Sequence, residues 1–183
     1  LGMWTVTLLL KPLVVSGHLL GGLSTLALLW WNLLRVRGLQ PVGRAGMVGT
    51  LARVAVCVLV LQIFLGGWTS ANYAALACTD FPTCQGRWLP DTDFREAFVL
   101  WRGLGVNYEF GVLETPARTA VHFTHRLGAL VTSLVILLTV AAAFTRSEPR
   151  LRQIASCILA AVLLQVGLGI TNVVGGLPLP VAV

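Results

Sequence analysis

Three histidines, His18, His122 and His125, are the side chains of this 183-residue chain with the clearest capacity for chemistry. Each lies in or beside a long apolar run without charged residues. Imidazole nitrogens bind metals and carry protons near neutral pH. An ionisable side chain within a membrane-spanning segment usually serves a function. We therefore treat these histidines as candidates for metal ligation or proton transfer.

An internal repeat relates His18 to His125. Each of the two is followed by Leu, Gly, Leu and Thr at the same four spacings. The match makes His125, rather than His122, the counterpart of His18. A second repeat relates residues 61–66 to residues 164–169. Aligning Leu1-Gly2 with Leu168-Gly169 places the counterpart of His18 two residues beyond Val183, which predicts a further histidine there.

Single histidines on separate helices suit a six-coordinate haem, whose two axial ligands approach from opposite faces of the ring. His18 and His125 are therefore the candidate iron ligands, each serving as one half of a pair. His122 and His125 share a helical face, so they cannot both ligate one haem, and we expect His122 to orient or hydrogen-bond. Arg126 needs a partner in the membrane, either a haem propionate or an acid of the outer loop.

Two roles that need no haem also stay open for these histidines. A membrane histidine can be a packed polar residue or part of a proton relay. Zinc fits less well, because no Asp, Glu or Cys lies nearby in the helices to complete the His-x-x-His pair.

Cys78 and Cys84 form a second candidate site, with five residues between them. An oxidising compartment permits a disulfide, and the spacing and the intervening Pro82 suit a small closed loop. A structural disulfide and a redox-active pair both remain open at this point.

The histidines must be positioned by membrane-spanning helices. Hydrophobic residues make up 56% of the chain and charged residues 11%, which argues against a soluble enzyme, a disordered tail and a coiled coil. Four runs are long enough to cross about 30 Å of hydrocarbon. We expect an all-α polytopic membrane helix bundle with four spanning helices plus the tail of an earlier helix. Their expected limits are residues 13–34, 54–70, 118–144 and 154–171.

The charges indicate the topology. The net charge of +6 comes mostly from arginines in the loops at 35–53 and around 146–152, and six of the seven acids lie in the loop at 71–117. The positive-inside rule then places the loop at 71–117 outside. Nucleic-acid binding is not expected, because the positive charge forms no single patch. A short amphipathic helix is expected on the membrane surface near residues 94–101.

Several motifs resemble those of one family. Residues 67–78 and 80–86 resemble the second outer cysteine loop of proteobacterial haem A synthases, which belong to the cytochrome oxidase assembly family. Residues 122–126 resemble the family's His-Arg helix motif. Residues 5–18 resemble its fourth helix, and residues 171–180 the lead-in to its eighth.

The resemblance implies an eight-helix architecture with two pseudo-twofold halves. Residues 1–34 would end the first half, 35–53 would be a cytoplasmic linker, and 54–183 would form the second half without its last span. His125 would then be one ligand of haem b, and His18 one histidine of the site for the substrate haem o. The family's acidic catalytic residue falls on a span outside this chain. We therefore assign no catalytic residue, and we expect the chain alone to be inactive.

The same resemblance implies a function and a location. The family oxidises the C8 methyl of haem o to a formyl, giving haem a for cytochrome oxidase, in the bacterial inner membrane. Haem o synthase, cytochrome oxidase and a second copy of the protein are the expected partners, and the outer cysteines are expected to form a disulfide. A membrane thiol–disulfide oxidoreductase using Cys78 and Cys84, or a non-enzymatic haem carrier or transporter, are the alternatives.

Overall fold

The computed structural model describes residues 1–38 and 46–178. Its helices follow one another along the chain as α1 (Gly2–Thr7), α2 (Pro12–Val36), α3 (Met47–Ala71), α4 (Phe94–Ala97), α5 (Thr115–Phe144) and α6 (Pro149–Val174). Four of them, α2, α3, α5 and α6, are long and apolar enough to cross a membrane. The predicted all-α polytopic membrane bundle is confirmed.

The spanning helices run beyond the uncharged windows that predicted them. Helix α3 begins at Met47 rather than at residue 54, so Arg53 belongs to the helix and not to the predicted linker. The guanidinium of Arg53 donates to the Gly49 carbonyl one turn earlier. A long basic side chain in a membrane helix can bend back so that its charge reaches the membrane surface. The helix can therefore extend beyond its apolar residues. Helices α2, α5 and α6 each carry a proline in the first turn, where the missing N–H is not needed.

The expected surface helix near residues 94–101 is reduced to the single turn α4. Asp93 caps it by accepting from the Glu96 N–H. The backbone leaves the helical conformation at Phe98. The amphipathic surface helix is therefore shorter than predicted. The predicted linker residues 39–45, including Arg44, and the predicted lead-in residues 179–180 lie outside the described residues.

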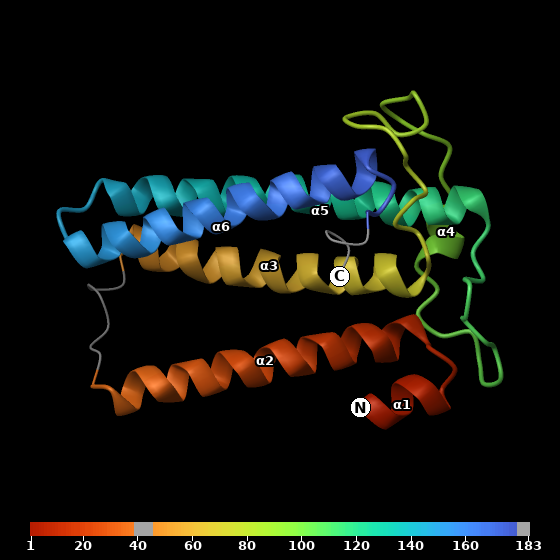
Figure 1. The fold of residues 1–183 in the computed structure, drawn as a ribbon, viewed down its shortest axis with the longest axis horizontal. Coiled ribbons are helices and arrows are strands. Elements are labelled where there is room, and N and C mark those ends of the chain that lie inside the picture. Colours follow the sequence, from red (N-terminus) through yellow and green to blue (C-terminus); the bar gives the residue numbers. More distant parts are fainter. Residues whose placement is uncertain (39–45, 179–183) are drawn as a thin grey trace.

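Helix α5 is the centre of the bundle. It packs along α3 and also contacts α6 and α4, whereas α2 packs on α3 and on α1. Figure 1 shows α4 and the long loops gathered at one end, where α2 and α5 begin and α3 and α6 finish. The histidines near the starts of α2 and α5 therefore lie toward that end.

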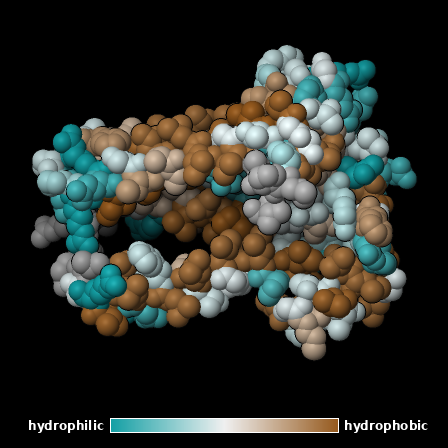
Figure 2. Space-filling view, in the orientation of Figure 1, coloured by the Kyte–Doolittle hydropathy of each residue, from teal (hydrophilic) through white to brown (hydrophobic). Residues whose placement is uncertain are grey.

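The surface has the pattern of a membrane protein. Figure 2 shows a broad hydrophobic middle over the long helices, with hydrophilic residues concentrated at the two ends. Buried apolar residues form two small clusters rather than one core. The first joins α3, α4 and α5 below the loops, and its buried members are Trp68, Ala74, Ala97, Leu113, Ala117, Ala120 and Val121. This cluster fixes the loop end of α5, the helix that carries two of the three histidines.

Candidate functional site

His125 lies half-buried on α5 and faces α3. The amide nitrogen Nε2 of Gln62 lies 3.0 Å from its Nδ1 and 3.1 Å from its main-chain oxygen. A Cβ placed on Gly66 would lie 3.3 Å from Cε1 of the ring, so the imidazole rests almost on the backbone of α3. The ring is thus fixed from two sides by residues one helical turn apart.

Gly128, one turn after His125, makes room for Gln62. A Cβ on Gly128 would overlap Oε1 of Gln62 and would lie 3.0 Å from Cδ1 of Leu65. Gln62 was not among the site residues predicted from the sequence, although its place in the repeat and its amide within an apolar run are the signals that mark it. The structure therefore adds Gln62 to the candidate site.

His18 has a similar but more open setting on α2. A Cβ on Gly2 of α1 would lie 3.5 Å from Cε1 of His18, as one on Gly66 would approach His125. The repeat thus corresponds to a repeated contact between a histidine and the glycine of a neighbouring helix. The His18 side chain is exposed among the described residues.

The structure does not bring His18 and His125 together. Among the described elements, α2 contacts α1 and α3 but not α5. The two histidines therefore lie on helices that do not pack against each other. This separation is expected if His18 and His125 belong to different halves of the eight-helix architecture.

His122 is buried, and its Nδ1 lies 2.9 Å from the carbonyl oxygen of Ala74. Because a carbonyl oxygen only accepts, Nδ1 carries the proton and donates. His122 therefore fastens the start of the outer loop to α5, and its Nε2 has the free lone pair. It makes no hydrogen bond with His125 in the part of the chain that the structure describes.

Arg126 binds the outer loop through main-chain oxygens instead of through an acid. Its Nη1 donates to the Thr83 carbonyl at 2.7 Å and its Nη2 to the Cys78 carbonyl at 3.1 Å. The guanidinium also lies 5.9 Å from the Phe81 ring centroid. Its Nε is buried without a hydrogen-bond partner among the described residues, so one N–H remains for a further acceptor.

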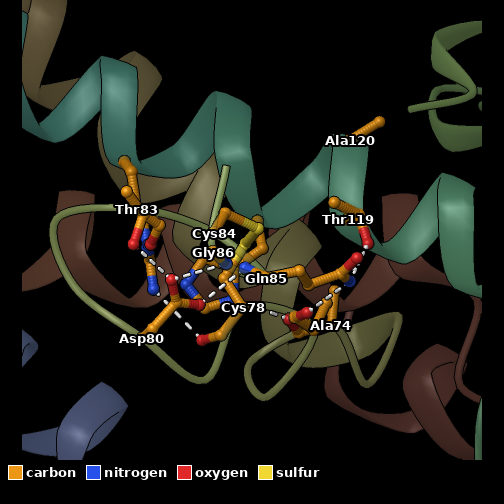
Figure 3. The surroundings of a disulfide bond; sticks show 12 residues. Ala74, Cys78, Asp80, Thr83, Cys84, Gln85, Gly86, Thr119 and Ala120 are labelled. Atoms are coloured by element: carbon orange, nitrogen blue, oxygen red, sulfur yellow. Dashed lines mark hydrogen bonds between the residues drawn. A yellow bond between two sulfur atoms is a disulfide. The ribbon is translucent and has the colours of Figure 1, made fainter. Parts of the chain in front are cut away.

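Cys78 and Cys84 form a disulfide, and both residues are buried. Figure 3 shows Asp80 inside the small loop that the disulfide closes. Its carboxylate accepts from the Thr83 hydroxyl and from the main-chain N–H groups of Gln85 at 2.6 Å and Gly86 at 3.0 Å. The Thr83 hydroxyl, followed by the Gly86 N–H, lowers the pKa of Asp80 to about 2.

The disulfide loop is docked on the helices by Gln85. Its amide donates to the Thr119 hydroxyl of α5 and to the Ala77 carbonyl, both at 3.0 Å (Figure 3). Between α1 and α2, the buried Lys11 binds a later part of the outer loop. Its ammonium group donates to the Gly103 carbonyl and lies 4.6 Å from the Trp101 ring centroid. The loop at 71–117 is therefore attached both to α5 and to the junction of α1 and α2.

This donor set fits an axially ligated haem better than a metal ion held by the protein alone. Across residues 1–38 and 46–178, no three side chains of His, Cys, Asp or Glu gather as such an ion would require. A haem needs one imidazole from each of two helices. His125 would supply one of them, and the Nε–H of Arg126, which has no hydrogen-bond partner among the described residues, would suit an anionic group.

The comparisons with known proteins agree on one family. The family model for cytochrome oxidase assembly proteins matches residues 1–183. The chain is 45% identical to the haem A synthase of Shewanella oneidensis, over all of this chain and 56% of that protein. It is 29% identical to the haem A synthase of Granulibacter bethesdensis, over 94% of this chain and 43% of that protein.

A third haem A synthase, from Roseobacter denitrificans, is 34% identical over 67% of this chain and 29% of that protein. The chain thus spans about half the length, or less, of these curated relatives. No solved structure matches it. With its match to the family model along the full chain and its similarity to haem A synthases, the chain belongs to the cytochrome oxidase assembly protein family.

Proposed function

We infer that this chain is part of a haem A synthase, a membrane oxidoreductase that converts the C8 methyl of haem o to a formyl to give haem a for cytochrome oxidase. The observation that carries the proposal is the setting of His125, whose ring lies against Gly66 and is held by Gln62. That setting, in a chain 45% identical to a haem A synthase, supports His125 as a haem ligand whose ring position is fixed by its neighbours.

In this proposal His125 is one ligand of haem b, and His18 belongs to the site for the substrate haem o. Bound haem supplies the electron transfer and the oxidising chemistry. The residues of this chain hold the ring and keep water out. His125 would present an imidazole nitrogen to the iron and Arg126 would offer its remaining N–H to a propionate, while His122 fastens the outer loop to α5. The catalytic acid or base is not assigned to a residue of this chain.

The proposed location is the bacterial inner membrane, with the loop at 71–117 on the periplasmic side. Six of the seven acids lie in that loop, and arginines dominate the loops at the other end. A disulfide is compatible with the periplasm. We further propose that this chain alone is inactive. The partners proposed for the whole protein are haem o synthase, cytochrome oxidase and a second copy of the protein itself.

The proposal is tested in the full-length protein that contains this chain. His125→Ala should abolish the low-spin haem b absorption of the purified protein, because the iron loses one axial ligand. His18→Ala should retain haem b but stop haem a formation, measured by chromatography of extracted haems. A bis-histidine haem b spectrum retained by His125→Ala would reject the assignment, and normal haem a production by His18→Ala would remove His18 from the substrate site.

The alternative of a thiol–disulfide oxidoreductase is less well supported by the geometry. An exchanging disulfide has to be reached by an attacking thiolate, whereas Cys78 is 0% and Cys84 1% exposed. A passive haem carrier would bind haem through the same histidines without changing it. The same chromatography separates that alternative, because only the enzyme yields a formyl product.

A further inference from the structure

Gln62 decides which nitrogen of the His125 ring carries the proton. Its Nε2 lies within hydrogen-bond distance of both the main-chain oxygen and Nδ1 of His125. The oxygen can only accept, so the amide group facing His125 is the NH2, which has two N–H donors. Nδ1 accepts the second of them, and the neutral ring therefore holds its proton on Nε2.

This tautomer is the opposite of the one that an iron ligand needs. With Nδ1 held by Gln62, Nε2 is the nitrogen left for iron. An imidazole bound through Nε2 has its proton on Nδ1, which must then donate to an acceptor. In its present orientation Gln62 would set an N–H donor against that N–H.

The other end of the same amide supplies the missing acceptor. Oε1 of Gln62 is buried and has no hydrogen-bond partner among the described residues. It lies over Gly128, where any side chain would overlap it. A half-turn about the Cγ–Cδ bond exchanges the amide oxygen and nitrogen, which are close in size, and brings Oε1 to Nδ1. The amide then gives up its hydrogen bond to the main-chain oxygen of His125, so the bond from Nδ1–H must replace it.

We propose that Gln62 is a positioning residue that reverses its amide when haem binds, donating to Nδ1 of His125 in the haem-free protein and accepting from it in the haem-bound protein. The inference rests on the proposed ligation of haem b by His125. The ring stays neutral in both states, because Nε2 gives up a proton and Nδ1 takes one. An acceptor on Nδ1–H also makes the imidazole a stronger electron donor to iron.

The experiment compares variants of the full-length holoprotein by the reduction potential of haem b and by its electron paramagnetic resonance. Gln62→Leu removes the acceptor, so the potential should rise and the low-spin signal should broaden as the ring loses its fixed orientation. Gln62→Glu places a stronger acceptor at Nδ1–H, so the potential should fall below that of the unmodified protein. Opposite shifts cannot come from a general loss of packing.

Two further variants complete the test. Thr139→Val removes a polar group on α5 that binds only the Val135 carbonyl of its own helix, and it should leave both signals unchanged. His125→Ala reports on the ligation itself through the haem b content. Potentials and spectra unchanged in both Gln62 variants, with haem lost in His125→Ala, would overturn the role of Gln62 alone. Haem b retained by His125→Ala would overturn the ligation and this inference together.

Discussion

Gly67 of α3 and Ser16 of α2 lie in close contact, with little room for a side chain on Gly67. A Cβ at Gly67 would lie 3.0 Å from Oγ and 3.3 Å from Cα of Ser16. Both residues are buried. Small residues let membrane helices approach closely, so this contact fixes α2, with His18, against α3.

Gly67→Ala should separate α2 from α3, because the new methyl group meets backbone as well as side-chain atoms. Overpacking of this kind costs about 1–3 kcal/mol, measured as a lower thermal unfolding midpoint of the full-length protein in detergent. Gly22→Ala on α2 is the matched control, since a Cβ there meets nothing within 4 Å. Equal midpoints for the two variants would show that the contact is not tight.

Trp68→Phe should loosen the outer loop from the helices. The indole Nε1 donates to the Ala97 carbonyl at 3.0 Å, and both residues are buried. Phenylalanine keeps most of the apolar contact but leaves the carbonyl without its donor, a loss of about 1–3 kcal/mol. Faster proteolysis of the loop would measure it. Trp88→Phe is the control, because Trp88 is 71% exposed; equally fast cleavage of both variants would contradict the prediction.

The sequence predicted the spans and the histidine repeat because both depend on local pattern. A run without charge predicts a membrane helix whatever its neighbours are, and the contacts of His18 with Gly2 and of His125 with Gly66 follow the repeat. The helix ends were less well predicted, since Arg53 can lie inside a helix when its side chain bends back to the membrane surface.

The partners of Gln62 and Arg126 could not be predicted in the same way. Gln62 meets His125 across a separation of 63 residues, which depends on how α3 and α5 pack. Arg126 was expected to bind a propionate or an acid, but two of its N–H groups reach carbonyl oxygens. Every residue has a carbonyl group, so composition carries no signal for this contact. The shortening of the surface helix to α4 likewise depends on the packing of the loop.

Acid should weaken the disulfide loop through Asp80. The pKa of this carboxyl is lowered to about 2 by the Thr83 hydroxyl and the Gly86 and Gln85 N–H groups, against about 3.9 in an unfolded chain. The stabilisation of the folded loop by the ionised carboxylate is complete above about pH 4 and is lost as the pH falls toward 2. The protection of the Gln85 and Gly86 amides, measured as their exchange rate relative to an unstructured chain at the same pH, should fall across that range.

Asp80→Asn should show lower protection of those amides already at pH 7, with little further loss of protection down to pH 2. Asp91→Asn removes a carboxylate whose ion pair with Arg87 is exposed, so it should behave like the unmodified protein. An Asp80→Asn loop as well protected at pH 7 as the original would show that the carboxylate is not what orders these N–H groups.

Cys78→Ser should lower stability more than it impairs chemistry. Opening a closed loop with a sequence separation of 6 costs about 2 kcal/mol in chain-entropy terms. We expect a lower unfolding midpoint with haem a production retained at low temperature. Cys57→Ser is the control, because Cys57 is a free, exposed cysteine. Complete loss of turnover in a folded Cys78→Ser protein would instead assign the pair to the reaction.

The two carbonyl groups that Arg126 holds belong to Cys78 and Thr83, which lie on the cross-linked segment itself. The disulfide therefore limits how far apart the two anchors of Arg126 can move. Reduction of the cross-link should accordingly loosen the hold of the Arg126 side chain on the outer loop.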